Sequence, residues 1–82
     1  MVTSNVFEKL RRKRDFPPPA VRRDLRERAG LTQEDVAGEI RVDRASVARY
    51  ELGAREPRGE TLRRYARLLD KLTLELDGKA GK

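Results

Sequence analysis

Two kinds of side chain that carry much of protein chemistry are absent from this chain. It contains no cysteine and no histidine, which excludes disulfides, thiolate nucleophiles, histidine general bases and the usual zinc sites. No apolar run approaches the roughly 20 residues needed to span a bilayer, and no signal peptide is visible. We therefore expect a soluble, cytoplasmic protein that folds without covalent cross-links, metal ions or cofactors.

The composition that remains is that of a small, basic protein. A chain of 82 residues forms at most one domain with a small core. Such a core leaves little room for a substrate pocket, and the sequence offers no plausible nucleophile–base pair, so an enzyme is disfavoured. The formal net charge of +6 favours a polyanionic partner, most simply nucleic acid. The alternative is a charged surface that only keeps a small protein soluble.

Residues 31–53 have the pattern of two short helices joined by a three-residue turn. Thr32 is a good N-cap for the first helix, and Asp35 follows three residues later, close to a capping box. The next apolar residues share one helical face: Val36, Ala37 and Ile40. The helical periodicity then breaks at residues 41–43, which predicts the turn.

The second helix of the pair should begin after Asp43, which can cap it. Val47 and Tyr50 then face inward, and Gly53 supplies the left-handed position at which the helix ends. Two helices with so short a connection cannot lie antiparallel and must cross steeply. This is helix-turn-helix geometry, in which the second helix enters the major groove of DNA.

Further helices are expected on both sides of this pair. Pro19 suits the first turn of a helix that runs to about residue 29. The apolar stripe of this helix is narrow and leaves Arg22 outside: Val21, Leu25 and Ala29. A last core helix should start near residue 59 or 60. Its buried side would carry Leu62, Tyr65, Ala66, Leu69 and, if it extends far enough, Leu72.

The N-terminal segment, residues 1–16, differs in character from the rest. It contains the basic run 11–14, for which two interpretations remain open. The segment is either a short helix that docks on the domain and leaves the arginines in water, or an arm that contacts phosphates or a minor groove. The three prolines at 17–19 cannot lie inside a helix. We interpret them as a stiff elbow, with a proline-rich ligand for a partner domain as the alternative.

The C-terminal segment alternates apolar and polar residues over 72–77, which is typical of a strand. An unpaired apolar strand is a liability in a monomer. We therefore expect it to pair with the same strand of a second copy across a two-fold axis, through Leu72, Leu74 and Leu76. The alternative is that the last helix continues and keeps two of these leucines on its stripe. On this basis residues 17–71 form the DNA-binding domain and 72–82 a dimerising strand and tail.

Three stretches of the chain resemble the lambda repressor and Cro type of helix-turn-helix protein. They are LRERAGLTQEDVA, ARYELG and REPRGETL, and the likeness covers about residues 21–69. It implies an all-α, compact helical bundle that binds DNA. Two departures concern stability, because Arg41 holds a turn position where glycine is usual and Gly38 lies inside a helix. The C-terminus is similar to that of HipB-like antitoxins, and a kinase-like toxin is one candidate partner.

The resemblance assigns roles to individual residues. It places four residues at the base-reading positions: Arg44, Ala45, Ser46 and Arg49. Arginine can donate two hydrogen bonds to a guanine, although phosphate contact is the alternative for both arginines. The family also joins an arginine of the first core helix to the glutamate before the glycine, which here are Arg26 and Glu51. Phosphate contacts are expected from Gln33 and from two loop arginines, Arg55 and Arg58.

These residues predict a sequence-specific regulator of transcription, most simply a repressor that binds a palindromic operator in double-stranded DNA as a homodimer. The alternative is an antitoxin that binds a toxin protein and represses its own operon. A protein adaptor that only uses the scaffold is a third class, because fold does not fix function.

Overall fold

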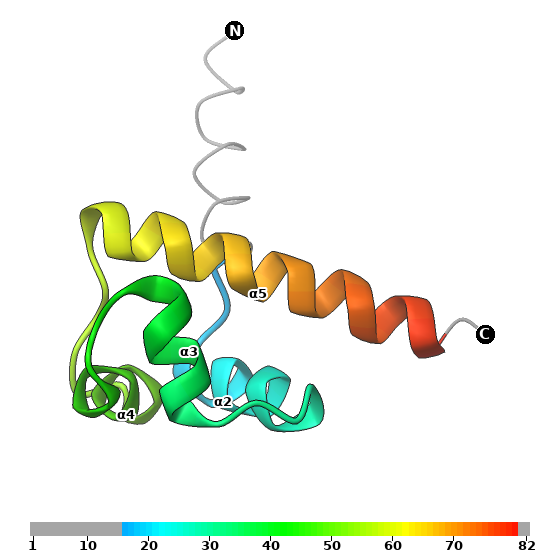
Figure 1. Ribbon diagram of the computed structural model, residues 1–82, viewed down its shortest axis with the longest axis horizontal. Coiled ribbons are helices and arrows are strands. Elements are labelled where there is room, and N and C mark those ends of the chain that lie inside the picture. The colour runs from blue at the N-terminus through cyan, green and yellow to red at the C-terminus, as the bar shows by residue number, and fades with distance from the viewer. Residues whose placement is uncertain (1–15, 81–82) are drawn as a thin grey trace, which may run out of the picture.

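The computed structural model describes residues 16–80, with side chains described as far as residue 77. This part of the chain forms four helices and no strand: α2 (Pro19–Arg28), α3 (Gln33–Ile40), α4 (Arg44–Leu52) and α5 (Gly59–Ala80). The three short helices pack together on one side of the long α5 (Figure 1). The prediction of an all-α bundle is confirmed. The proposed N-terminal helix and the basic run 11–14 lie outside the described residues.

The first described helix buries a different face from the one expected. α2 begins at Pro19, which lies in its first turn, as predicted. Leu25 is buried and Ala29 packs against the core, but Val21 is 42% exposed. Arg22 is buried in its place, with 3% of its surface exposed. The predicted apolar stripe was wrong at this position, where Arg22 is buried and Val21 is not. Arg22 can be buried because it finds hydrogen-bond acceptors inside the domain.

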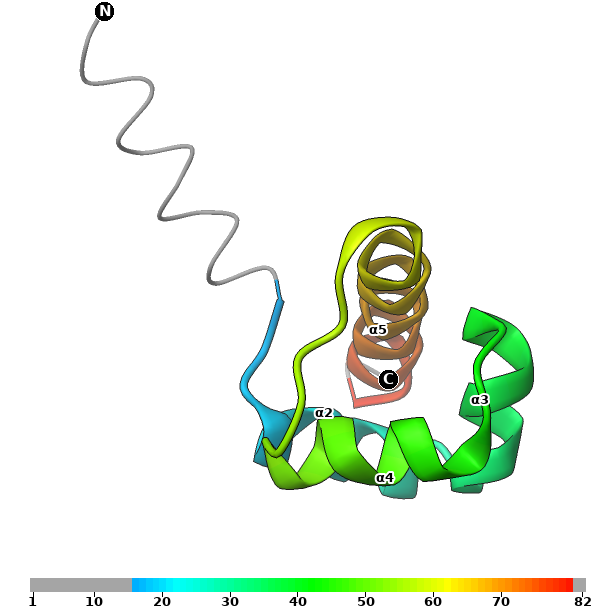
Figure 2. The same ribbon diagram turned by 90° about the vertical axis from the view of Figure 1, so that its left-hand side faces the viewer.

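The helix-turn-helix pair forms as predicted. The Thr32 hydroxyl accepts a hydrogen bond from the Asp35 N–H at 3.0 Å, and the Asp35 carboxylate accepts one from the Thr32 N–H at 2.8 Å, which completes the capping box. The Asp43 carboxylate accepts the Ser46 N–H at 2.8 Å and caps α4. Figure 2, which looks nearly along α5, shows α3 and α4 crossing steeply. The apolar faces of α3 and α4 meet in the core, to which the two helices contribute five buried residues: Val36, Ala37, Ile40, Val47 and Tyr50.

Acid should loosen both caps. Hydrogen bonding to Thr32 lowers the pKa of Asp35, with the larger effect from the Thr32 N–H and the smaller from its hydroxyl. The Ser46 side chain and N–H lower the pKa of Asp43. Both carboxyls bind a proton less readily when folded, so their stabilisation is present above their unfolded pKa of about 3.9 and is lost as pH falls through their folded values. Urea midpoints measured from pH 6 downward should drop below about pH 4. Asp43→Asn still accepts the Ser46 N–H but does not titrate, so this variant should show a smaller drop.

The turn between α3 and α4 contains one strained residue. Arg41 has φ 65° and ψ 49°, a left-handed conformation that costs an L-residue with a Cβ roughly 1–2 kcal/mol. Arg41→Gly should therefore raise the free energy of unfolding by about 0.5–1 kcal/mol, once the greater chain entropy of glycine is subtracted. Urea denaturation would measure this gain. The matched control is Gly53→Ala, which should destabilise, because Gly53 has φ 76° and a Cβ there would lie 3.3 Å from Pro19 Cγ. A less stable Arg41→Gly would contradict the assignment of strain.

The predicted C-terminal strand is wrong, because α5 continues through residues 72–77 to Ala80. Leu72 is buried in the same core as Leu69, and Leu76 packs against that core. These three leucines recur every three or four residues, so a helix buries them together while satisfying its own backbone hydrogen bonds. Only Leu74 points away, with 70% of its surface exposed. Leu72 and Leu76 therefore belong to the core of this chain, and α5 runs without a break across residue 71.

Candidate nucleic-acid interface

The outer face of α4 carries the residues expected to read bases. Val47 and Tyr50 point into the core, whereas Arg44, Ala45 and Arg49 are exposed. Ser46 is half-buried, and its N–H is used by the cap. α4 lies at the edge of the bundle, with α5 across the other side of the core (Figure 2). Its outer face is therefore open to a large partner.

A buried ion pair ties α4 to α2. Arg26 donates two hydrogen bonds to the Glu51 carboxylate, at 2.6 and 3.0 Å, and a third to the Leu31 carbonyl at 2.9 Å. The two side chains are only 12% and 3% exposed. The hydrogen bond to Glu51 raises the pKa of Arg26 against the opposing effect of its burial. This pair, which the family likeness implied, fixes the C-terminal half of α4 against the scaffold.

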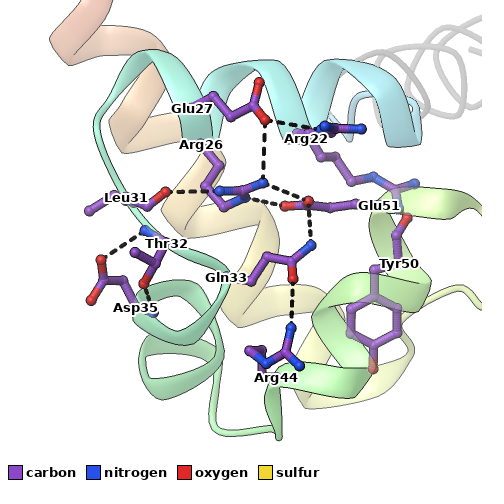
Figure 3. Close-up of polar contacts among 11 residues, drawn as sticks. Arg22, Arg26, Glu27, Leu31, Thr32, Gln33, Asp35, Arg44, Tyr50 and Glu51 are labelled. Atoms are coloured by element: carbon purple, nitrogen blue, oxygen red, sulfur yellow. Dashed lines mark hydrogen bonds and ion pairs between the residues drawn. The ribbon is translucent and has the colours of Figure 1, made fainter.

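Gln33 extends this pair to the surface, as Figure 3 shows. Its amide nitrogen donates to Glu51 Oε1 at 3.1 Å, and its amide oxygen accepts from the Arg44 guanidinium at 3.3 Å. The two partners fix which way the amide points, because the carboxylate can only accept and the guanidinium can only donate. A continuous polar chain thus runs from Arg26 to Arg44. This chain brings Gln33, an expected phosphate contact, beside Arg44, an expected base reader, at the N-termini of α3 and α4.

The loop between α4 and α5 holds the other expected phosphate contacts. Arg55 and Arg58 are exposed. Both line a hollow of about 630 Å³ that opens between the end of α4 and the start of α5. Their guanidinium groups can therefore reach an anion that approaches this side of the domain.

Sequence reasoning missed Arg22. Its guanidinium donates to the Pro17 carbonyl at 2.7 Å, the Tyr50 carbonyl at 3.1 Å and the Glu56 carboxylate at 2.9 Å. It also lies over the Phe16 ring, 4.3 Å from the centroid. One signal could have found it. Residues 22, 25 and 29 have helical spacing as good as 21, 25 and 29, but the apolar valine favoured the second set.

A comparison with protein families decides the class. The Helix-turn-helix family model matches residues 23–76, more than half of the chain. The chain belongs to the Cro/C1-type helix-turn-helix family. This helix-turn-helix protein is thus a DNA-binding protein of the transcription-regulator kind. No curated protein and no solved structure gives a significant match to it. Within residues 16–80 of the helix-turn-helix protein, no helix combines the length and apolar character needed to cross a bilayer.

Proposed function

We propose that this protein is a sequence-specific repressor that binds a palindromic operator as a homodimer. It acts in the cytoplasm, by occupying DNA and not by catalysis. One observation supports this most strongly. α4 buries Val47 and Tyr50 and exposes Arg44 and Arg49. A recognition helix anchored in this way can enter the major groove with its guanidinium groups toward the base edges.

Direct readout would come from the first turns of α4. Arg44 and Arg49 can each donate two hydrogen bonds to guanine O6 and N7, and the Ala45 methyl suits a thymine methyl. Ser46 can contact either kind of base pair. Arg44 is already held by Gln33 at 3.3 Å. This hydrogen bond reduces the side-chain entropy that Arg44 would lose on binding DNA.

Phosphate contacts would set the register of α4 in the groove. Gln33 is the first residue of α3, where free backbone N–H groups and the helix dipole favour an anion. Arg55 and Arg58 lie at the far end of α4, around the hollow described above. Contacts at both ends of the recognition helix would hold it against rotation in the groove.

Dimerisation would bring two recognition helices to half-sites about one helical turn apart. The C-terminal end of α5 extends past the other helices (Figure 1) and carries Leu74, which is 70% exposed. Since residues 72–77 are helical, the proposed interface is between helices and not between strands. The antitoxin alternative drew on a dimerising strand, so the described chain gives no reason to prefer a toxin partner.

Leu74→Lys should weaken the dimer and lower operator affinity at low protein concentration. The thermal midpoint of the dilute, monomeric protein should not change, because Leu74 is outside the core. Sedimentation equilibrium and duplex binding would measure these effects. Leu52→Lys is a control for sedimentation, since Leu52 is 77% exposed on another helix. An unchanged association constant for Leu74→Lys would remove Leu74 from the interface.

Selection from a random duplex pool tests the function itself. We expect enrichment of a near-palindrome with guanines in each half-site, and a steep fall of affinity with salt, because binding to phosphates releases counterions. A pool that stays random, together with binding that is insensitive to salt, would mean that the protein is not a sequence-specific DNA reader.

A further inference from the structure

Arg22 joins three parts of the chain that are distant in sequence. One guanidinium group binds Pro17 before α2, Tyr50 near the end of α4 and Glu56 in the following loop. The Arg22 side chain is 3% exposed, whereas Glu56 is 54% exposed. The loop carboxylate therefore comes to the edge of the core to meet a buried cation.

We propose that Arg22 and Glu56 are positioning residues for DNA binding, which hold the 53–58 loop so that Arg55 and Arg58 meet phosphates. This inference rests on the proposed function. It adds a role for two residues that touch no base and lie outside the contacts expected from the sequence.

The guanidinium of Arg22 is placed to hold the loop rigidly. Arg22 donates through one terminal nitrogen to the Tyr50 carbonyl at 3.1 Å and through the other to Glu56 at 2.9 Å. The group is planar and rigid, so the two bonds fix the loop relative to the recognition helix. Pro57, next to Glu56, is buried. The loop is therefore anchored at two successive residues, and these lie between Arg55 and Arg58.

Stability alone does not explain this arrangement. A buried arginine ion pair often stabilises a fold no more than well-packed apolar residues of similar volume, because desolvation opposes the attraction. A half-exposed carboxylate between two arginines would also repel DNA phosphates if it acted only as a charge. The positive charge of Arg22 offsets that repulsion, and its hydrogen bond to the Glu56 carboxylate orients the loop.

Glu56→Asp tests the proposal, because it keeps the charge but withdraws the carboxylate by one methylene from Arg22. For each phosphate that is no longer bound, we expect affinity to fall by about five- to tenfold at roughly 0.1 M salt, equally on specific and random duplexes. The slope of log K against log salt should become shallower by about 0.9 for each such phosphate. If Glu56→Asp only lowered the folding stability, the molecules that remain folded would bind DNA with an unchanged salt slope. Circular dichroism would measure the fraction of the protein that is folded.

Two controls make the experiment decisive. Glu60→Asp is the same change at a carboxylate of similar exposure, 53%, which pairs with Arg63 at 3.1 Å on α5. It should leave affinity and slope unchanged. In a background with Arg55→Ala and Arg58→Ala, Glu56→Asp should have no further effect, because it acts through those arginines.

The outcomes separate the two proposals. If the unaltered protein binds no duplex DNA, the proposed function fails. If it binds, but Glu56→Asp retains its affinity and slope, or weakens binding equally in the double-alanine background, the positioning role is overturned. Arg22→Lys provides a second measurement, since a lysine keeps the charge but cannot make both bonds in one plane. It should reproduce the shallower slope.

Discussion

Glu51→Ala is expected to cost about 3–5 kcal/mol of folding stability. The Glu51 side chain is 3% exposed and accepts two hydrogen bonds from Arg26 and one from Gln33. Its removal takes from the largely buried Arg26 its hydrogen-bonded partner and leaves the half-exposed Glu27 carboxylate, 3.7 Å away, as the remaining counter-ion. A buried charge that loses its main partner is much more costly than a missing pair. For a domain of this size the loss corresponds to a fall of roughly 12 °C or more in Tm.

Thermal and urea unfolding, followed by circular dichroism, would measure this loss. Arg26→Met combined with Glu51→Leu is the informative control, because removing both charges avoids the unpaired cation. The double variant should be more stable than Glu51→Ala. Asp24→Ala controls for the removal of a surface carboxylate, since Asp24 is 59% exposed and pairs with Arg28 at 3.4 Å, and it should change stability by less than about 1 kcal/mol. If Glu51→Ala were no worse than Asp24→Ala, the pair would not hold α4 in place.

The second large effect concerns recognition. Replacing both Arg44 and Arg49 by alanine should remove about 1–3 kcal/mol of discrimination at each contacted base pair. The affinity for the selected operator should then approach the affinity for random duplex. Because both residues are exposed, the fold should be unaffected. The measurement is the ratio of the dissociation constants for the selected and random duplexes at one salt concentration.

Single substitutions distinguish base readout from phosphate contact. Arg49→Ala should lower the specificity ratio, whereas Arg55→Ala should weaken all sequences alike and reduce the salt slope by about 1. Arg63→Ala removes an arginine that is 67% exposed on α5 and serves as the control for net charge. If Arg49→Ala weakened every duplex equally, Arg49 would bind a phosphate and the base readers would have to be sought among the other exposed residues of α4.

The helix-turn-helix pair was predictable because its determinants are local. Thr32 and Asp43 cap helices whose first turns lie within three residues of them, and Gly53 ends α4 in the left-handed conformation it alone adopts cheaply. The inward side of α4 followed from the helical period. The Arg26–Glu51 pair needed the family likeness, since no local rule joins residues 25 positions apart.

The sequence by itself determined where the recognition helix begins and ends and which of its side chains face outward, because capping and periodicity operate within a few residues. The tertiary structure alone decided the remainder. The leucines at 72, 74 and 76 fit a strand, whereas those at 69, 72 and 76 fit a helix, and the helix prevails because the core accepts Leu72 and Leu76. Arg22 is buried because its acceptors, up to 34 residues away, converge on it only after the helices have packed.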